Sequence, residues 1–235
     1  MSLSHEDLAR MIDHTLLIPE AHPEQIDRLC EEAIEHGFFG ICVHPVFVRR
    51  VADRLARASS GLTPADGPAI VSVAGFPLGC NRSEVKADEA RRAIDDGARE
   101  IDMVIHVGSL VSGDARSVRN EIEALAHVVH RAPNGVLKVI LETTALTADQ
   151  IILGCRCCAE GEADFVKTST GLHPGGGATV EHVRLLRRHA APIRVKAAGG
   201  IRTADAALAM IEAGADRLGT SAGVAIVTGF RQRTA

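Results

Sequence analysis

The chain has 235 residues, of which 46% are hydrophobic and 24% charged, and its formal net charge at pH 7 is -4. This balance excludes a disordered or a membrane-spanning chain and predicts an ordinary folded protein. Aromatic residues make up only 3%, with six Phe, no Trp and no Tyr. A mildly acidic chain with so few rings offers neither attraction to a polyanion nor a surface for base stacking, so we expect no nucleic-acid partner.

The first residues, MSLSHEDLARMIDH, lack the basic start, apolar stretch and cleavage site of a secretory signal. No apolar run approaches the roughly 18 residues that suggest a transmembrane helix. We therefore expect a cytoplasmic protein whose six cysteines are reduced thiols. Cys155, Cys157 and Cys158 form a cluster, but it contains no CxxC pair and no His at zinc spacing, which favours helix packing over a metal site.

Short apolar runs alternate with amphipathic stretches, and no long linker interrupts them, so one domain over residues 1–235 is predicted. Eight of the apolar runs are candidate strands, and they start about every 30 residues, the size of one βα unit. They cover residues 11–14, 39–44, 69–76, 100–107, 136–142, 164–168, 193–198 and 217–220.

The stretches between these runs carry helix start and stop signals. Pro23 opens one predicted helix, and Gly37 ends it as a left-handed cap would. Asp114, Thr147 and Thr203 are suitable N-caps for three others.

Eight parallel strands alternating with helices predict an α/β fold, the (β/α)8 TIM barrel, with aliphatic side chains filling the barrel interior. An open doubly wound sheet is the alternative, but it typically has fewer strands. Neither GxGxxG nor GxxxxGK[ST] is present to support it.

Four predicted strands carry a charged residue where a buried strand should be apolar. These residues are Asp102, Lys138, Lys167 and Lys196. Because side chains alternate along a strand, Asp102 should share an inward face with His106, and the lysines should converge with Asp102 at the carboxyl ends of the strands.

Two interpretations of this charged cluster are open. It can be a buried ion-pair network that only fixes strand register. The favoured interpretation is that one lysine is an amine nucleophile. Desolvation and a second ammonium group would lower its pKa, and the aspartate would relay protons.

The segments around these lysines resemble those of a known enzyme family. Residues 164–171, DFVKTSTG, resemble the Schiff-base lysine segment of the deoxyribose-phosphate aldolases, and residues 195–202, VKAAGGIR, resemble their second-lysine segment. Six further segments match in family order: IDHTL at 12–16, ICVHP at 41–45, VAGFPLG at 73–79, EIDMV at 100–104, LKVILET at 137–143 and GTS at 219–221. The eight matches span nearly the whole chain.

The resemblance implies a class I aldolase that reversibly cleaves 2-deoxy-D-ribose 5-phosphate to D-glyceraldehyde 3-phosphate and acetaldehyde, in deoxyribose phosphate catabolism. No cofactor and no metal are expected. By the same resemblance, Lys167 forms the imine, Asp102 transfers protons, Lys196 transfers protons and lowers the pKa of Lys167, and Lys138 is an accessory charge.

A phosphate group needs backbone donors, which barrels often supply in the loops after strands 7 and 8. Those loops contain Gly199, Gly200 and Ser221, and the loop after strand 6 adds Gly171. Ordinary turn glycines are the alternative interpretation.

Several positions depart from the family pattern. Leu172 occupies the place of a phosphate-binding lysine found in some members, and His44 and His106 stand where Asn is usual. The absence of tyrosine removes a C-terminal proton shuttle that some members use. The loop at residues 171–178 is either a lid or a plain connector.

Two other functions remain open: a related Schiff-base aldolase or transaldolase-like enzyme acting on another phosphorylated sugar, and a non-enzymatic sugar-phosphate-binding barrel. The combination of Asp102, Lys167 and Lys196 favours the enzyme. The expected partners are small sugar phosphates and aldehydes, with no nucleic acid and no membrane. A homo-oligomer is left open.

Overall fold

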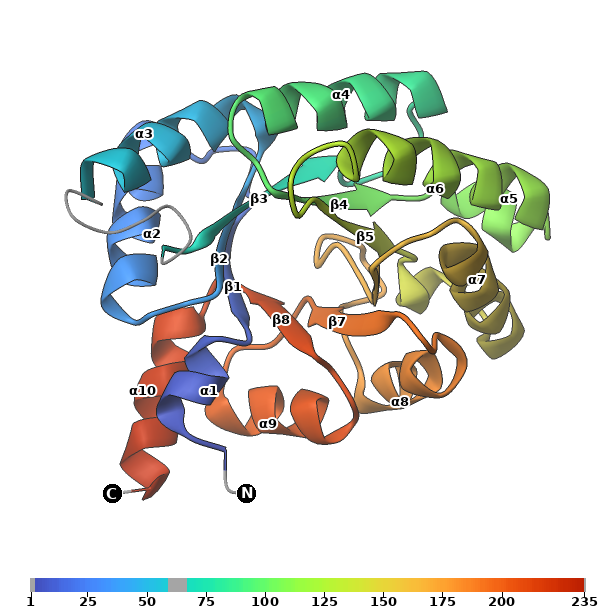
Figure 1. The fold of residues 1–235 in the computed structure, drawn as a ribbon. Coiled ribbons are helices and arrows are strands. Elements are labelled where there is room, and N and C mark those ends of the chain that lie inside the picture. Colours follow the sequence, from blue (N-terminus) through green and yellow to red (C-terminus); the bar gives the residue numbers. More distant parts are fainter. Residues whose placement is uncertain (1–2, 59–66, 235) are drawn as a thin grey trace.

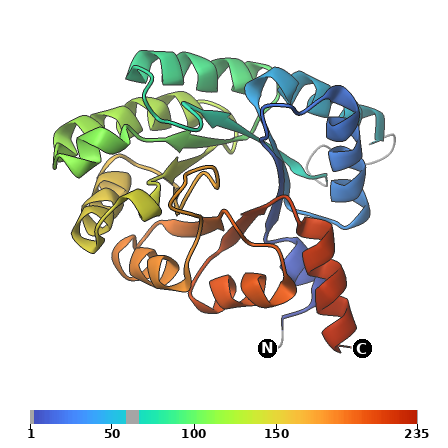
Figure 2. The ribbon, with the colours of Figure 1, turned by 180° about the vertical axis from the view of Figure 1, so that it is seen from behind.

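Eight parallel strands pair in sequence order, and β1 pairs with β8 to close a barrel. The computed structural model describes residues 3–58 and 67–234. The strands are β1 (Ile12–Leu16), β2 (Gly40–Val43), β3 (Ala69–Ala74), β4 (Glu100–Val104), β5 (Val136–Ile140), β6 (Phe165–Lys167), β7 (Arg194–Ala198) and β8 (Arg217–Thr220). Figures 1 and 2 show the barrel from its two ends with the helices outside it, which confirms the predicted (β/α)8 TIM barrel.

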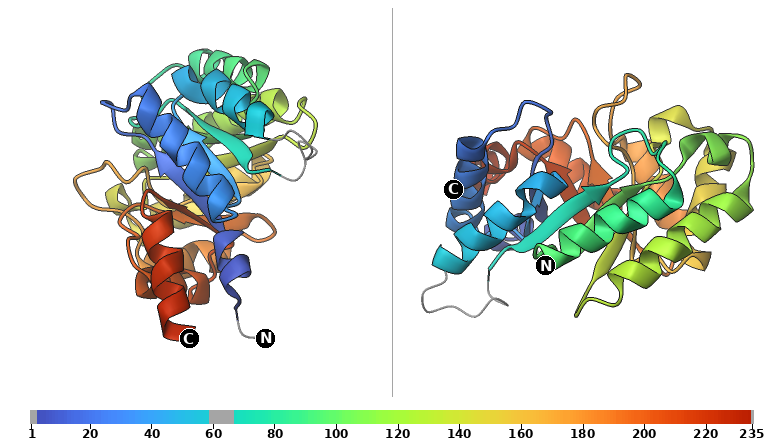
Figure 3. Two further views of the ribbon diagram at one scale, coloured as in Figure 1. Left: turned by 90° about the vertical axis from the view of Figure 1, so that its left-hand side faces the viewer. Right: turned by 90° about the horizontal axis from the view of Figure 1, so that it is seen from above.

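Apart from α1, which precedes β1, the helices outside the barrel follow the strands in chain order. They are α1 (His5–Ala9), α2 (Pro23–Glu35), α3 (Val48–Ala58), α4 (Ser83–Asp95), α5 (Val107–Val111), α6 (Ala115–Val129), α7 (Ala148–Glu160), α8 (Val180–His189), α9 (Ala204–Glu212) and α10 (Gly223–Thr234). Short 3-10 turns cover Pro45–Phe47 and Thr143–Ala145. Near the two ends of the chain α1 packs against α10 (Figure 3). Among residues 3–58 and 67–234, no helix is both long and apolar enough to cross a membrane.

The predicted helix caps are confirmed. Gly37 follows α2 with a φ of 67°, which suits glycine. The Asp114 carboxylate accepts a hydrogen bond from the Ser117 N–H at 3.0 Å. Thr147 and Gln150 form a reciprocal capping box, and Thr203 accepts from the Ala206 N–H at 3.2 Å.

All eight predicted strands are present, and most differ from the prediction only at their ends. The largest difference is in the fourth, predicted to reach residue 107. Because β4 ends at Val104 and α5 starts at Val107, His106 becomes an N-cap whose Nδ1 lies 2.8 Å from Ser109 Oγ. The expectation that His106 shares an inward face with Asp102 is therefore wrong.

The barrel interior also differs from the expected aliphatic filling. Aliphatic contacts inside it come mainly from β2 and β3, where Cys42, Val71 and Val73 form a small cluster. On the other strands several inward positions hold buried charged residues: Asp13, Glu100, Asp102, Lys138, Lys167, Lys196 and Arg217. The larger apolar core lies between the strands and the helices.

Candidate active site

Three lysines converge on one carboxylate in the barrel. Nζ of Lys138 lies 2.7 Å from Oδ1 of Asp102, and Nζ of Lys167 and of Lys196 each lie 2.7 Å from Oδ2. Strand register causes this convergence, because Asp102 pairs with Lys138 across β4 and β5, and Lys167 pairs with Lys196 across β6 and β7. The structure thus brings together the four residues predicted as catalytic.

A second group of charges lies against the first. Arg217 donates to Asp13 Oδ1 at 2.8 Å and to Glu100 Oε2 at 3.2 Å, while Nζ of Lys138 lies 2.7 Å from Glu100. Asp13 also accepts from Lys196, so the two groups form one network. Four cations then face three carboxylates, and the charges balance when one lysine is neutral. Sequence reasoning missed Glu100 and Arg217, although both begin strands as charged residues.

The network perturbs the two central lysines in opposite directions. Burial lowers the pKa of Lys167, and the Lys196 ammonium adds to this effect while Asp102 opposes it. For Lys196, burial also acts to lower the pKa, but Asp102 and Asp13 outweigh it and raise the pKa above its usual value. Lys196 is therefore held as an ammonium, whereas Lys167 is the amine that loses its proton more readily.

The aspartate between them is held as a carboxylate. Burial alone would raise its pKa, but Lys138, Lys167 and Lys196 overcome this and keep the pKa of Asp102 well below its usual value. A permanent negative charge here suits a hydrogen-bond acceptor that aligns the three lysine amino groups.

A cavity of about 170 Å³ opens at the carboxyl ends of the strands, and Lys167 lines it. All four residues predicted to bind phosphate line it as well: Gly171, Gly199, Gly200 and Ser221. Among the described residues, its lining includes two cationic side chains, Lys167 and Arg202, and no carboxylate. Arg202 was missed by the site prediction, although it follows the Gly199-Gly200 pair and belongs to a matched segment. An anion fits this lining.

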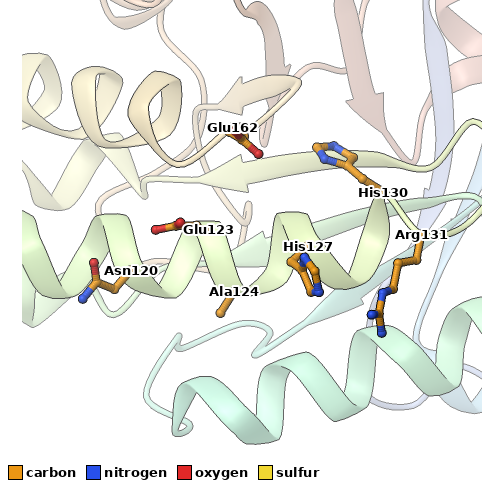
Figure 4. A pocket seen from close by; sticks show the side chains of 7 residues that line it. All are labelled: Asn120, Glu123, Ala124, His127, His130, Arg131 and Glu162. Carbon is orange, nitrogen blue, oxygen red and sulfur yellow. The ribbon is translucent and has the colours of Figure 1, made fainter.

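A larger cavity of about 650 Å³ lies outside the barrel, along α6. Figure 4 shows its lining, which comes from α6, the turn after α6 and the turn after α7: Asn120, Glu123, Ala124, His127, His130, Arg131 and Glu162. None of the predicted site residues lines this cavity. The candidate active site is therefore the smaller cavity, because Lys167 of the lysine cluster lines it.

The positions that depart from the family pattern have distinct environments. Leu172 lines the barrel cavity and is 50% exposed, so an apolar side chain stands beside the proposed anion site. His44 Nε2 lies 3.1 Å from the Leu17 carbonyl oxygen. Cys42, which lies in the matched segment ICVHP and is no departure, is fully buried on β2, and burial raises the pKa of its thiol to about 11, so the thiol stays protonated.

The loop at residues 171–178 is attached to β7 at its far end. The Ala178 N–H donates to the carbonyls of Ala198 and Gly199 at 3.1 and 3.0 Å. Gly177 lies directly against Gly199, where a Cβ on Gly177 would come 2.2 Å from the Gly199 oxygen. The connection to β7 therefore restrains this end of the loop.

Comparisons with known proteins agree with the geometry. The model of the DeoC/LacD family aldolases matches residues 8–229. The deoxyribose-phosphate aldolase of Thermococcus gammatolerans is 50% identical, and the match covers 96% of this chain and 97% of the relative. That of Brevibacillus brevis is 48% identical over 96% and 97%.

A solved structure is similar over the same extent. It is described as a unique tetrameric deoxyribose phosphate aldolase from Aeropyrum pernix, with a TM-score of 0.87 and 35% identity, and the match covers 98% of this chain and 93% of that one. The match to the family model over nearly the whole chain, together with relatives near 50% identity, establishes that this chain belongs to the DeoC/LacD family of aldolases.

Proposed function

We propose that the chain reversibly cleaves 2-deoxy-D-ribose 5-phosphate to D-glyceraldehyde 3-phosphate and acetaldehyde through a Schiff base on Lys167. The observation that carries this proposal is the buried Lys167 amine, which lines the cavity while bonded to Asp102 beside the Lys196 ammonium. The deoxyribose-phosphate aldolases near 50% identity support the choice of substrate. The same substrate would place the chain in deoxyribose phosphate catabolism.

In the first step the neutral Nζ of Lys167 attacks C1 of the open-chain sugar, and the carbinolamine loses water to give a protonated imine. The iminium then accepts the electron pair of the C2–C3 bond as that bond breaks. The C3 hydroxyl gives up its proton as C3 becomes the aldehyde of glyceraldehyde 3-phosphate. The enamine left on Lys167 takes a proton at C2, and water releases acetaldehyde and the free amine.

Asp102 and Lys196 are assigned to the proton transfers. Because the pKa of Asp102 is held well below its usual value, Asp102 stays ionised and orients a water and the Lys196 ammonium, and protons would pass along these hydrogen bonds without resting on the carboxylate. Lys196 stays charged and disfavours a second charge on Lys167. Lys138 is assigned an accessory role, since it neutralises the other oxygen of Asp102.

The phosphate is assigned to Gly171, Gly199, Gly200 and Ser221, with Arg202 as an additional cation. Glycine allows the backbone N–H groups to approach the anion closely, and Gly171, Gly199 and Gly200 have positive φ values that suit it. Leu172 adds no charge, so Arg202 would supply the positive side chain at this end of the cavity.

We also propose that the protein acts in the cytoplasm on small molecules and assembles as a homo-oligomer. The tetrameric relative from Aeropyrum pernix supports the oligomer. Light scattering of the purified protein checks this, and a monomer mass at micromolar concentration would contradict it.

Borohydride trapping tests the nucleophile. The sequence contains four lysines, Lys86, Lys138, Lys167 and Lys196, and all four side chains are buried. Acetaldehyde with borohydride is expected to add one ethyl group to the wild-type chain at Lys167, located by peptide mass mapping, because Lys167 lines the cavity. Lys167→Met should lose the label and the cleavage activity, whereas Lys86→Met should keep the label. Equal labelling of Lys167→Met would disprove the assignment.

A further inference from the structure

Glu142 has an unusual backbone and a buried side chain next to the barrel cavity. It lies between β5 and the Thr143–Ala145 turn, with φ of 59° and ψ of 61°, and only 4% of it is exposed. The left-handed region disfavours residues with a Cβ, and such residues cluster at functional sites when the surroundings hold them in place. The contacts of the Glu142 side chain account for this backbone conformation.

The carboxylate of Glu142 binds the loop that follows β6. The Thr170 N–H donates to Oε2 at 3.2 Å and to Oε1 at 3.4 Å, and the Thr170 hydroxyl donates to Oε2 at 2.5 Å. The same hydroxyl accepts from the Leu172 N–H at 3.1 Å. One buried carboxylate thus fixes the backbone on both sides of Gly171.

This fixed span is part of the cavity. Thr170, Gly171 and Leu172 all line it, whereas Glu142 itself does not belong to its lining. Gly171 has a φ of 83°, and a Cβ added there would come 3.2 Å from the Gly199 Cα. The loops after β6 and β7, which both carry proposed phosphate-binding glycines, are therefore in contact, and Glu142 supports the first of them from behind.

We propose that Glu142 is a positioning residue for the phosphate end of the substrate. It acts through Thr170, setting the orientation of the Gly171 peptide toward the anion without touching the substrate. This inference rests on the proposed function, because it assumes that the cavity takes a phosphorylated sugar. A donor held in place in advance binds an anion better than one that must be ordered on binding.

The test compares 2-deoxyribose 5-phosphate with unphosphorylated 2-deoxyribose. In Glu142→Gln the side chain keeps one acceptor oxygen but loses the charge that holds both donors of Thr170. The ratio of kcat/KM for the phosphorylated over the unphosphorylated sugar is expected to fall about tenfold, mainly through KM for the phosphorylated sugar. Glu162→Gln is the matched control, because Glu162 also has a positive φ, 63°, but lines the cavity along α6. The control should leave the ratio unchanged.

A second pair of variants tests the proposal if Glu142→Gln does not fold. Thr170→Val removes the hydroxyl that joins Glu142 to Leu172 and should lower the ratio, and Thr170→Ser should restore it. Equal losses on both sugars would overturn the proposal, since a purely structural role predicts them.

If the wild type cleaves neither sugar, the proposed function fails, and calorimetric titration with inorganic phosphate still decides the role of Glu142. Weaker phosphate binding in Glu142→Gln than in Glu162→Gln supports the proposal, and equal binding overturns it.

Discussion

Lys167 and Lys196 share one carboxylate, yet they differ in one neighbour. Lys196 also contacts Asp13, and this second carboxylate raises its pKa despite burial. Lys167 has Asp102 alone as a carboxylate partner and the Lys196 ammonium nearby, so burial and repulsion lower its pKa. A single additional contact therefore separates a lysine held as an ammonium from one that loses its proton more readily.

Removing the Lys196 charge should move the pH dependence of catalysis. In Lys196→Met the pKa of Lys167 rises, because a repelling ammonium is lost while Asp102 stays. Less of the Lys167 amine is then neutral at a given pH. The rising limb of the plot of kcat/KM against pH is therefore expected to shift to higher pH by about one pH unit. Lys86→Met is the control, since its ammonium pairs with Glu121 away from the lysine cluster. An unmoved limb in Lys196→Met would refute the electrostatic role.

The residues of the site differ in how well sequence predicts them. Asp102 and the three lysines interrupt apolar runs, so strand alternation within a predicted barrel is enough to expect them to converge. Glu100 and Arg217 were missed because both stand at the first position of a strand, where a polar residue is ordinary. Glu142 has no sequence signal, since its role depends on a left-handed backbone and on a contact with Thr170 that only the fold creates.

The elements of the barrel are predictable to within a few residues, because buried strands and capped helices leave periodic patterns. The carboxyl ends of the strands are predicted less accurately, since apolar residues continue from the strands into the loops. The region after β4 is the clearest case, where Ile105 extends the apolar run beyond the strand. There the Ile105 carbonyl lies against Gly79, which has a φ of 67° and donates its N–H to the Gly75 carbonyl at 2.8 Å.

Gly79 should tolerate no side chain. A Cβ at this position would come 1.9 Å from the Ile105 oxygen, so Gly79→Ala must displace backbone that follows β4. Gly113 is a matched control, with a φ of 79° and nothing within 4 Å of the added Cβ. Gly113→Ala is expected to cost about 1 kcal/mol of unfolding free energy from backbone strain alone, and Gly79→Ala at least about 3 kcal/mol. Urea unfolding measures both; equal losses would contradict the close contact.

At the scale of the whole molecule, one charged network joins six of the eight strands. Its members come from β1, β4, β5, β6, β7 and β8, while β2 and β3 face it with Cys42, Val71 and Val73. Burying such groups costs desolvation energy that their mutual attraction only partly offsets, so the network is a poor source of stability. It instead makes stability depend on the protonation of its carboxylates.

Acid should therefore destabilise the barrel through Asp13 and Asp102. Burial acts to raise the pKa of Asp13, but Lys196, Arg217 and Lys138 lower it well below the ordinary value of 3.8. Below about pH 4 the unfolded chain binds a proton at this residue and the folded chain does not. As the pH is lowered, the free energy of unfolding therefore decreases by up to about 1.4 kcal/mol per pH unit for each such group. The contribution is fully present above this window.

Asp13→Asn isolates that dependence. The variant should be less stable by about 3 kcal/mol at pH 7, because Lys196 and Arg217 lose a charged partner inside the barrel. Its unfolding free energy should also fall less steeply between pH 4 and the onset of acid unfolding, since one proton-linked group is gone. Asp53→Asn, on the exposed side of α3, controls for the loss of one carboxylate. Urea titrations at several pH values measure the slopes, and the same slope in Asp13→Asn and Asp53→Asn would mean that the buried carboxylates do not control the acid stability of the barrel.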